Sequence, residues 1–436
     1  MKIRERLCAS GLFRIVRAAF QKVADPRAPE LVEISLTDTL MSAFALFSLK
    51  DPSLLAFDQR RHTDPNLHTV YGIEEIPCDT QMRTTLDAVE PAAFHPLFKD
   101  IFRELQRGKV LEPFVFLNGC YLLSLDGTGY FASHKIHCEA CCQKVNPQTG
   151  EVTYYHQMLG GALVHPDLKE VIPLAPEPII KQDGQTKNDC ERNAAKRFFE
   201  QCRRDHPHLP VIITEDALSA NAPHIEELKK YDLHFILGVK SGDHAYLFEQ
   251  VEAAYQRGET TEVEIREPAI THRFRFLNHV GLNQSHPELW VNFVEYWEVQ
   301  PDGTLQHFSW ITDLRVTREN VFPIMRGGRA RWKIENETFN TLKNQGYHFE
   351  HNFGHGEKNL SVVFALLMML AFLVDQTQQA ACQLFQAVLR KSGSRRALWE
   401  NMRSLFHTLP FDSMESIYRA ILYGFRVQGL EILDSG

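Results

Sequence analysis

A run of alternating helices and buried strands constrains the fold of this chain more than any other feature. Apolar residues at helical spacing predict a helix over 188–204, and the short apolar run 211–213 predicts a buried strand. A second helix is expected over 223–231 and a second strand over 234–239. This succession of strand and helix is typical of a layered α/β domain. The sequence therefore predicts an α/β core.

The regions on either side of this run have different patterns. Alternating apolar residues near 261–265, 273–276 and 290–294 predict antiparallel strands. A chain of 436 residues is long enough for two or three domains. We expect five regions: a helical N-terminal domain over 1–112, the first part of the core over 113–245, a β-rich insertion over 246–315, the completion of the core over 316–375, and a helical C-terminal region over 376–436.

The composition predicts a folded cytoplasmic protein without a membrane span. The apolar run 362–374 is too short to cross a bilayer and suits a buried helix, and no signal peptide fits the N-terminus. Nine cysteines in a chain of this length suit a reducing compartment. The net charge of −8 counts weakly against nucleic-acid binding, because local basic clusters decide such contacts. Basic clusters lie within residues 1–27, 326–333 and 390–396. Each could be a solvated face of the protein or a site that binds phosphate.

Three acidic residues form a candidate catalytic group. Asp126 and Asp216 lie where buried strands are predicted to end, and Glu335 lies at the start of a predicted helix. Carboxylates from separate elements can hold two Mg²⁺ ions about 3.5–4 Å apart, one activating the attacking oxygen and the other stabilising the leaving oxygen of a phosphodiester. Mn²⁺ could substitute for Mg²⁺. On spacing alone, Asp126 could belong to a turn, Asp216 could be a helix cap, and Glu215 competes with Asp216.

Three sequence blocks carry a resemblance to a known family. Residues 124–128 read SLDGT, residues 212–216 read IITED, and residues 329–335 read RARWKIE. Over about residues 110–360 the chain resembles the DDE transposases of bacterial insertion sequences. The most similar subgroup has a β-rich insertion and a signature of Tyr, two residues, Arg, three residues, Glu, six residues and Lys.

The resemblance implies a fold, an activity and partners. It implies a ribonuclease-H-like core in which Asp126, Asp216 and Glu335 bind Mg²⁺ and catalyse cut-and-paste transposition. Arg331 and Lys343 are then expected to contact DNA phosphates, although Arg331 and Glu335 could also form only an ion pair within a helix. The expected partners are double-stranded DNA, as terminal inverted repeats and as target, and a second copy of the chain in a synaptic homodimer. The helical region 1–112 could recognise the DNA ends.

Two departures from the signature keep other functions open. Gly328 stands where the signature has Tyr, and Lys343 lies one residue later than the pattern requires. Glu337 is a second acid in the same block, but Arg331 lies one helical turn before Glu335, which favours Glu335. The alternatives are a catalytically inactive DNA-binding protein derived from a transposase and a nuclease that does not rejoin strands.

A cysteine-rich segment predicts a second possible metal site. Cys138 and Cys141 have the spacing of a zinc knuckle, with His134 or His137 as a further ligand. Cys190 and His156 are more distant candidates. A structural zinc ion and a group of small buried thiols are both compatible with this pattern.

Other aromatic and histidine residues have simpler interpretations. Trp290, Trp297 and Trp310 lie in or near the β-rich insertion, where related transposases hold a flipped base, but a strand tryptophan is more often part of a core. His348, His351 and His355 are close enough in the sequence to bind a metal, but Asn352 and the glycines beside them favour another interpretation. They predict a loop that leads into the buried helix.

Overall fold

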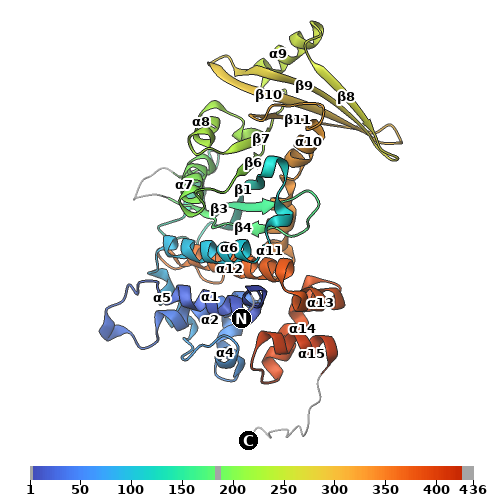
Figure 1. The fold of residues 1–436 in the computed structure, drawn as a ribbon. Helices are drawn as coiled ribbons and strands as arrows, with labels where there is room; N and C mark the ends of the chain where they lie inside the picture. The colour runs from blue at the N-terminus through green and yellow to red at the C-terminus, as the bar shows by residue number, and fades with distance from the viewer. Residues whose placement is uncertain (1–2, 182–187, 425–436) are drawn as a thin grey trace, which may run out of the picture. The chain divides into compact units, whose positions relative to one another are not determined.

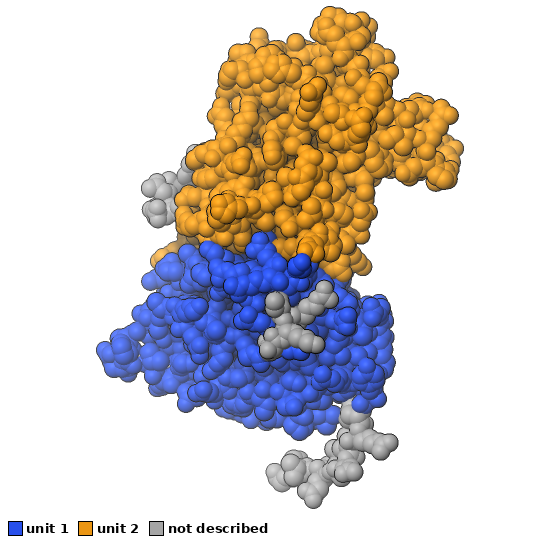
Figure 2. Space-filling view, in the orientation of Figure 1, with its two compact units in different colours: residues 1–110, 342–436 blue, residues 111–341 orange. Residues whose placement is uncertain are grey.

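Residues 3–181 and 188–424 are described by the computed structural model, in which the chain forms two units. Unit 1 takes residues 1–110 and 342–436, and unit 2 takes residues 111–341 (Figure 2). Unit 1 is helical, whereas unit 2 contains a large mixed sheet (Figure 1). The prediction of an α/β chain is confirmed at this level, and the ribonuclease-H-like core stays a prediction.

Unit 1 is organised around the apolar helix α12 (Leu360–Ala381), which is buried along almost its whole length. Helix α12 contacts α2 (Leu36–Ser48), α5 (Asp79–Asp87) and α6 (His95–Arg107). The other helices of unit 1 are η1 (Ile3–Leu7), α1 (Ala9–Phe20), η2 (Pro29–Leu31), α3 (Leu54–Arg60), α4 (Asn66–Thr69), η3 (Pro91–Phe94), α13 (Gln383–Ser392), α14 (Arg395–Thr408) and α15 (Met414–Tyr423). Segments from both ends of the sequence thus share one core.

This arrangement corrects the predicted domain boundaries. We expected the helical regions 1–112 and 376–436 to be separate and residues 316–375 to complete the core. In the structure the core unit ends at Thr341, and residues 342–436 join the N-terminal helices. The physical reason is that α12 is apolar on all sides, so it must be surrounded, and helices of the N-terminal region supply part of that cover.

Helix α12 also confirms the predicted buried helix. Among the described residues it is the one helix long and apolar enough to cross a membrane, judged by length and composition. The whole of its most apolar stretch is buried within the structure. Such burial is the normal behaviour of a core helix, because a span in a bilayer would present these side chains to lipid.

Unit 2 is built on one sheet with the strand order β2-β3-β1-β6-β7-β11-β10-β9-β8, and β4 and β5 pair with β3 beside this path. The strands are β1 (Tyr121–Ser133), β2 (Cys142–Val145), β3 (Val152–Val164), β4 (Ile172–Pro173), β5 (Glu177–Ile179), β6 (Val211–Glu215), β7 (His234–Gly238), β8 (Thr261–Arg266), β9 (Thr271–Asn283), β10 (His286–Val299) and β11 (Leu305–Thr312). Strand β1 is antiparallel to β3 and parallel to β6, and β6 is parallel to β7.

The predicted strand–helix–strand unit is present. Helix α7 (Glu191–Asp205) precedes β6, and α8 (Ala222–Lys230) connects β6 to β7. Both helices lie beside the central strands in Figure 1. The remaining helices of unit 2 are η4 (Glu112–Phe114), η5 (Leu117–Gly119), η6 (Ala217–Ser219), α9 (Ala245–Gln256), α10 (Val321–Arg329) and η7 (Ile334–Phe339), while α11 (Asn340–Asn344) runs across the boundary between the units.

The antiparallel strands predicted within residues 246–315 are present, with one correction. Strands β8 to β11 are antiparallel, and β11 pairs with β7, so they extend the central sheet. We expected residues 246–315 to lack helical spacing, yet α9 occupies 245–256. The helix forms because Leu247, Val251 and Ala254 recur at helical spacing and are buried together.

Candidate functional site

Asp126 lies in the middle of β1. We expected it at the end of a strand, but β1 continues to Ser133 because its antiparallel pairing with β3 continues past Asp126. Only the parallel pairing with β6 stops before this residue, at Ser124 and Thr214. Asp126 therefore marks the place where two neighbouring strands separate. One of its carboxylate oxygens accepts a hydrogen bond from the Gly127 amide at 2.9 Å.

Asp216 follows directly after β6, as predicted. The parallel pairing of β1 with β6 ends at Ser124 and Thr214, two residues before Asp126 and Asp216 respectively. Both aspartates line the same cleft. Asp216 also caps η6, since its Oδ1 accepts a hydrogen bond from the Leu218 amide at 2.9 Å. The second oxygen is not needed for this cap.

Glu215 is the neighbouring acid that competed with Asp216 in the sequence. It is buried, and its Oε2 lies 2.6 Å from Nε2 of His224 on α8. Burial alone would lower the pKa of His224, but the Glu215 carboxylate raises it above its ordinary value. Glu215 is thus engaged in an ion pair between β6 and α8. This favours Asp216 as the more accessible of the two acids.

Helix η7 brings Glu335 to Asp126. Ser124 Oγ donates a hydrogen bond to the Arg331 carbonyl at 2.9 Å, which fixes the segment before η7 against β1. On β3, the lack of a side chain at Gly160 makes room for Phe339, because a Cβ there would lie 2.9 Å from two carbons of the Phe339 ring. The helix can therefore approach the strands closely enough for Glu335 to affect Asp126.

Arg331 joins the two acids. Its Nη1 lies 2.5 Å from Oε1 of Glu335 and 3.5 Å from Oδ2 of Asp126. Burial and the neighbouring Glu335 carboxylate raise the pKa of Asp126 to about 7. One positive charge therefore lies between two carboxylates. The ion pair expected as the alternative role of Arg331 is present, and it includes Asp126 as well.

A cleft of about 570 Å³ opens beside the two aspartates. Asp126, Asp216, Glu191 and His224 contribute to its lining, whereas Glu335 reaches Asp126 from outside that lining. Partial burial and the charges of Asp216 and Glu215 raise the pKa of Glu191. A carboxyl whose pKa is raised by neighbouring acids in a cleft marks a negatively charged environment, which a divalent cation would stabilise.

Glu191 is a residue that the sequence interpretation missed. It is the first residue of α7, and the backbone of Gly127 lets it approach β1. A Cβ at position 127 would lie 2.1 Å from Oε1 of Glu191. The available signal was an acid in the first turn of a predicted helix, and its proximity to Gly127 is visible only in the structure.

Gly328 is the position where the family signature has Tyr. It lies on α10, and a Cβ there would be 2.3 Å from Nε1 and 2.6 Å from Cε2 of Trp310. The indole ring of Trp310, buried on β11, therefore occupies the space that a side chain at 328 would enter. Glycine at position 328, where the signature has Tyr, therefore leaves room for the Trp310 ring.

We expect Gly328→Ala to destabilise unit 2 by about 1–3 kcal/mol, because a rigid ring and two elements must shift to admit one methyl group. Urea unfolding followed by tryptophan fluorescence measures the effect. Gly242→Ala is the matched control, since a Cβ at Gly242 meets no atom within 4 Å. Equal unfolding midpoints for the two variants would contradict the packing described here.

The other basic residues of the third block have partners within unit 2. Arg326 forms an ion pair with Asp167, and Arg329 with Glu298. Lys333 donates to the Leu168 carbonyl at 2.6 Å. Lys343 belongs to unit 1, where its Nζ lies 2.9 Å from Oε1 of Glu350. These contacts account for the cluster without DNA, so its phosphate-binding role stays a prediction.

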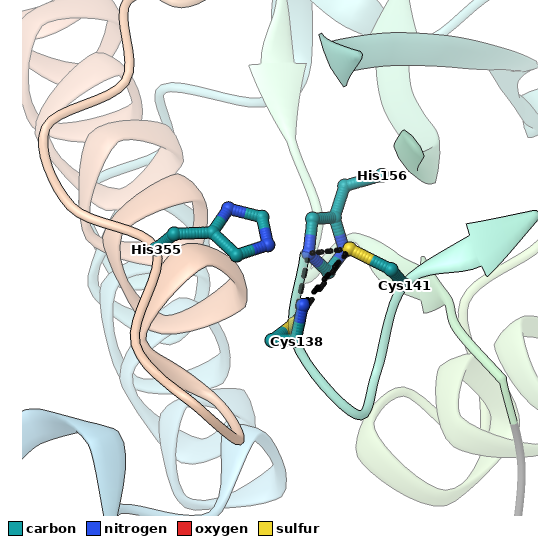
Figure 3. A group of neighbouring side chains, drawn as sticks. All are labelled: Cys138, Cys141, His156 and His355. Carbon is teal, nitrogen blue, oxygen red and sulfur yellow. Dashed lines mark hydrogen bonds between the residues drawn. The ribbon is translucent and has the colours of Figure 1, made fainter. Parts of the chain in front are cut away.

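The cysteine segment forms a cluster that could bind a metal. Nε2 of His156 lies 3.3 Å from the sulfur of Cys138 and 3.3 Å from that of Cys141, and the two sulfurs are 3.8 Å apart (Figure 3). All three side chains are buried in unit 2. Figure 3 also draws His355, which belongs to unit 1.

The remaining candidates from the cysteine segment lie elsewhere. His134 contacts the Val152 carbonyl at 3.3 Å, and the ring of His137 stacks on Tyr154 with the ring centres 4.4 Å apart. Cys190 is exposed and lines the acidic cleft. The histidine that lies beside the two cysteines is therefore His156, the candidate that is more distant in the sequence.

The tryptophans of the insertion differ in exposure. Trp310 is buried, as most strand tryptophans are, whereas Trp290 is 48% exposed. Trp290 stacks on His279, with the ring centres 4.1 Å apart. Trp297 stacks on His307 at 5.2 Å. An exposed stacked ring is a suitable surface for a base, but the structure assigns it no ligand.

Comparison with known proteins adds no further assignment. No protein-family model and no curated protein matches this chain.

Proposed function

We propose that this chain is a DNA transposase of the DDE type, with Asp126, Asp216 and Glu335 as its metal-binding acids. One observation carries the proposal. Asp126 and Glu335 lie far apart in the sequence but share Arg331, and Asp216 lines the same cleft as Asp126. Three acids from three elements are the donor set that two Mg²⁺ ions need.

The mixed sheet supports a ribonuclease-H-like core. Strands β1 and β6 are adjacent and parallel; Asp126 lies within β1, and Asp216 follows the end of β6. The helices α7 and α8 flank β6 in the chain. Open α/β sheets usually bind ligands beyond the carboxyl ends of their parallel strands, which is where Asp216 lies. The β-rich insertion falls between Asp216 and Glu335, as in the subgroup that the sequence resembles.

The extra residue between Glu335 and Lys343 also has a structural explanation. Residues 334–339 form a π-helical turn, in which hydrogen bonds span five residues where an α-helix spans four. One such turn absorbs one inserted residue without changing the face of the helix that follows. The longer spacing is therefore compatible with the signature, and π-helical turns are frequent at functional sites.

The residues of the site can perform distinct tasks in this reaction. When bound, two Mg²⁺ ions would supply the activation of the attacking oxygen and the stabilisation of the leaving oxygen. Asp126 must lose its proton to become a ligand, and its pKa of about 7 allows this near neutral pH. Cation binding would remove the need for Arg331 to neutralise the acids. Its guanidinium would then be free to hold a DNA phosphate.

The proposed partners are double-stranded DNA and a second copy of the chain. Cutting at a transposon end and joining it to target DNA requires the ends to be held together, which a homodimer would achieve. Net charge does not favour a general affinity for DNA, because the chain carries −8. Binding is therefore expected to depend on local contacts at the terminal repeats and to weaken with salt.

An end-joining assay tests the proposal. Purified protein is incubated with Mg²⁺ and a DNA fragment bearing the inverted repeats that flank the gene. We expect cleavage at the repeat end and a product joined to target DNA, both abolished by a chelator. A fragment with a scrambled repeat is the control. Binding without cleavage would instead indicate a catalytically inactive DNA-binding protein, and cleavage without joining a nuclease. Either result would contradict the proposal.

A further inference from the structure

The cluster of Cys138, Cys141 and His156 lies at the meeting point of three strands. Cys138 and Cys141 belong to the connection between β1 and β2, and His156 lies on β3. His156 is paired with Phe131 of β1, and the next residue of β3 towards the N-terminus, Tyr155, is paired with Cys142 of β2. The connection and the sheet therefore face each other through two thiols and one imidazole.

The distances within this cluster fit a tetrahedral metal. A zinc–sulfur bond of about 2.3 Å and the tetrahedral angle place two thiolate sulfurs about 3.8 Å apart. The sulfurs of Cys138 and Cys141 are 3.8 Å apart. A sulfur and an imidazole nitrogen on the same ion should be about 3.6 Å apart. Both sulfurs lie 3.3 Å from Nε2 of His156, so a shift of a few tenths of an ångström would seat the ion.

The connection between β1 and β2 has few apolar contacts among its described residues. Its buried apolar cluster consists of Cys138, Ala140 and Cys141, with Tyr154 and Ile180 packed against it. Residues 134–137 before this cluster are exposed. Such small side chains bury little area, at about 25 cal/mol per Å², and cannot by themselves fix an exposed connection. A metal would supply the missing stabilisation, as in other small metal-bound loops.

We propose that Cys138, Cys141 and His156 bind a structural zinc ion that fastens the β1–β2 connection to β3. The two thiols lose their protons to solvent and bind as thiolates, and His156 binds as neutral imidazole through Nε2. Sulfur and imidazole ligands select zinc over Mg²⁺, which prefers oxygen. This site is chemically separate from the three acids, and the proposal does not depend on transposase activity.

Metal analysis of the purified full-length protein tests the proposal. We expect about one zinc ion per chain in the wild type, and a loss of most of it in Cys138→Ser, Cys141→Ser and His156→Ala. With Co²⁺ in place of zinc, the wild type should show visible d–d bands and a near-ultraviolet thiolate band. Cys142→Ala is the matched control, because Cys142 is buried next to the cluster but its sulfur contacts the Ile179 carbonyl instead.

Limited proteolysis keeps the proposal testable if a variant folds poorly. Lys135 and Lys144 are exposed on either side of the two cysteines. A chelator should speed tryptic cleavage of the wild-type protein at these two sites at least about tenfold, and added zinc should reverse it. Wild-type protein without zinc or Co²⁺ bands, or with a disulfide between Cys138 and Cys141, would overturn the proposal. Equal zinc loss in Cys142→Ala would also overturn the ligand assignment.

Discussion

Asp126→Asn is expected to lower the rate of DNA end cleavage by at least about a thousandfold, the scale of losing one preorganised charge at a reacting centre. Asparagine keeps the size of the side chain and can still accept the hydrogen bond from the Gly127 amide. It removes the negative charge that a divalent cation requires. The fold and the DNA-binding surface should therefore persist, and affinity for the terminal repeat should change by no more than about twofold.

Matched variants separate loss of chemistry from loss of structure. Asp232→Asn makes the same substitution in an exposed turn where the backbone is left-handed (φ 51°), a conformation that asparagine tolerates. It should cleave DNA at the wild-type rate. Glu335→Gln should behave like Asp126→Asn, whereas Glu337→Gln should retain cleavage. If Glu337→Gln were inactive and Glu335→Gln active, the third acid would be misassigned. Wild-type cleavage by Asp126→Asn would refute the metal site as a whole.

The sequence was sufficient where a feature depends on local spacing. The helices around 191–205 and 222–230 and the strand before Asp216 follow from apolar periodicity, which the chain displays within short windows. The identification of Glu335 used the helical spacing to Arg331, and that ion pair is present.

Features that depend on remote partners could not be predicted. Asp126 lies within a strand because β3 continues to pair with it, and β3 begins 26 residues later in the chain. His156 was named as a distant candidate together with Cys190, and the choice between them depends on the pairing of β3 with β1 and β2. The place of Trp310 beside Gly328 depends on β11 lying next to β7. The spacing of residues in a single sequence does not indicate which distant strands will pair.

The buried ion pair of unit 1 is another remote contact, and it has the second large expected effect. Lys50 follows α2, its side chain is fully buried, and its Nζ lies 2.5 Å from Oδ2 of Asp375 on α12. Tyr347 donates to the same oxygen at 2.6 Å. The Lys50 ammonium also lies 3.8 Å from the centre of the Trp399 ring. Burial lowers the pKa of Lys50 and raises that of Asp375, so each charge needs the other.

Asp375→Asn should therefore destabilise unit 1 by about 3–5 kcal/mol, because it leaves the Lys50 charge buried without its counterion. Urea unfolding followed by far-ultraviolet circular dichroism reports on this helical unit. The double variant Lys50→Met with Asp375→Asn removes both charges, and the introduced asparagine can still accept the hydrogen bond from Tyr347. It should be more stable than Asp375→Asn alone by about 2 kcal/mol. If the two substitutions instead destabilise additively, the ion pair does not hold α2 and α12 together, and packing of α12 alone would account for the stability of unit 1.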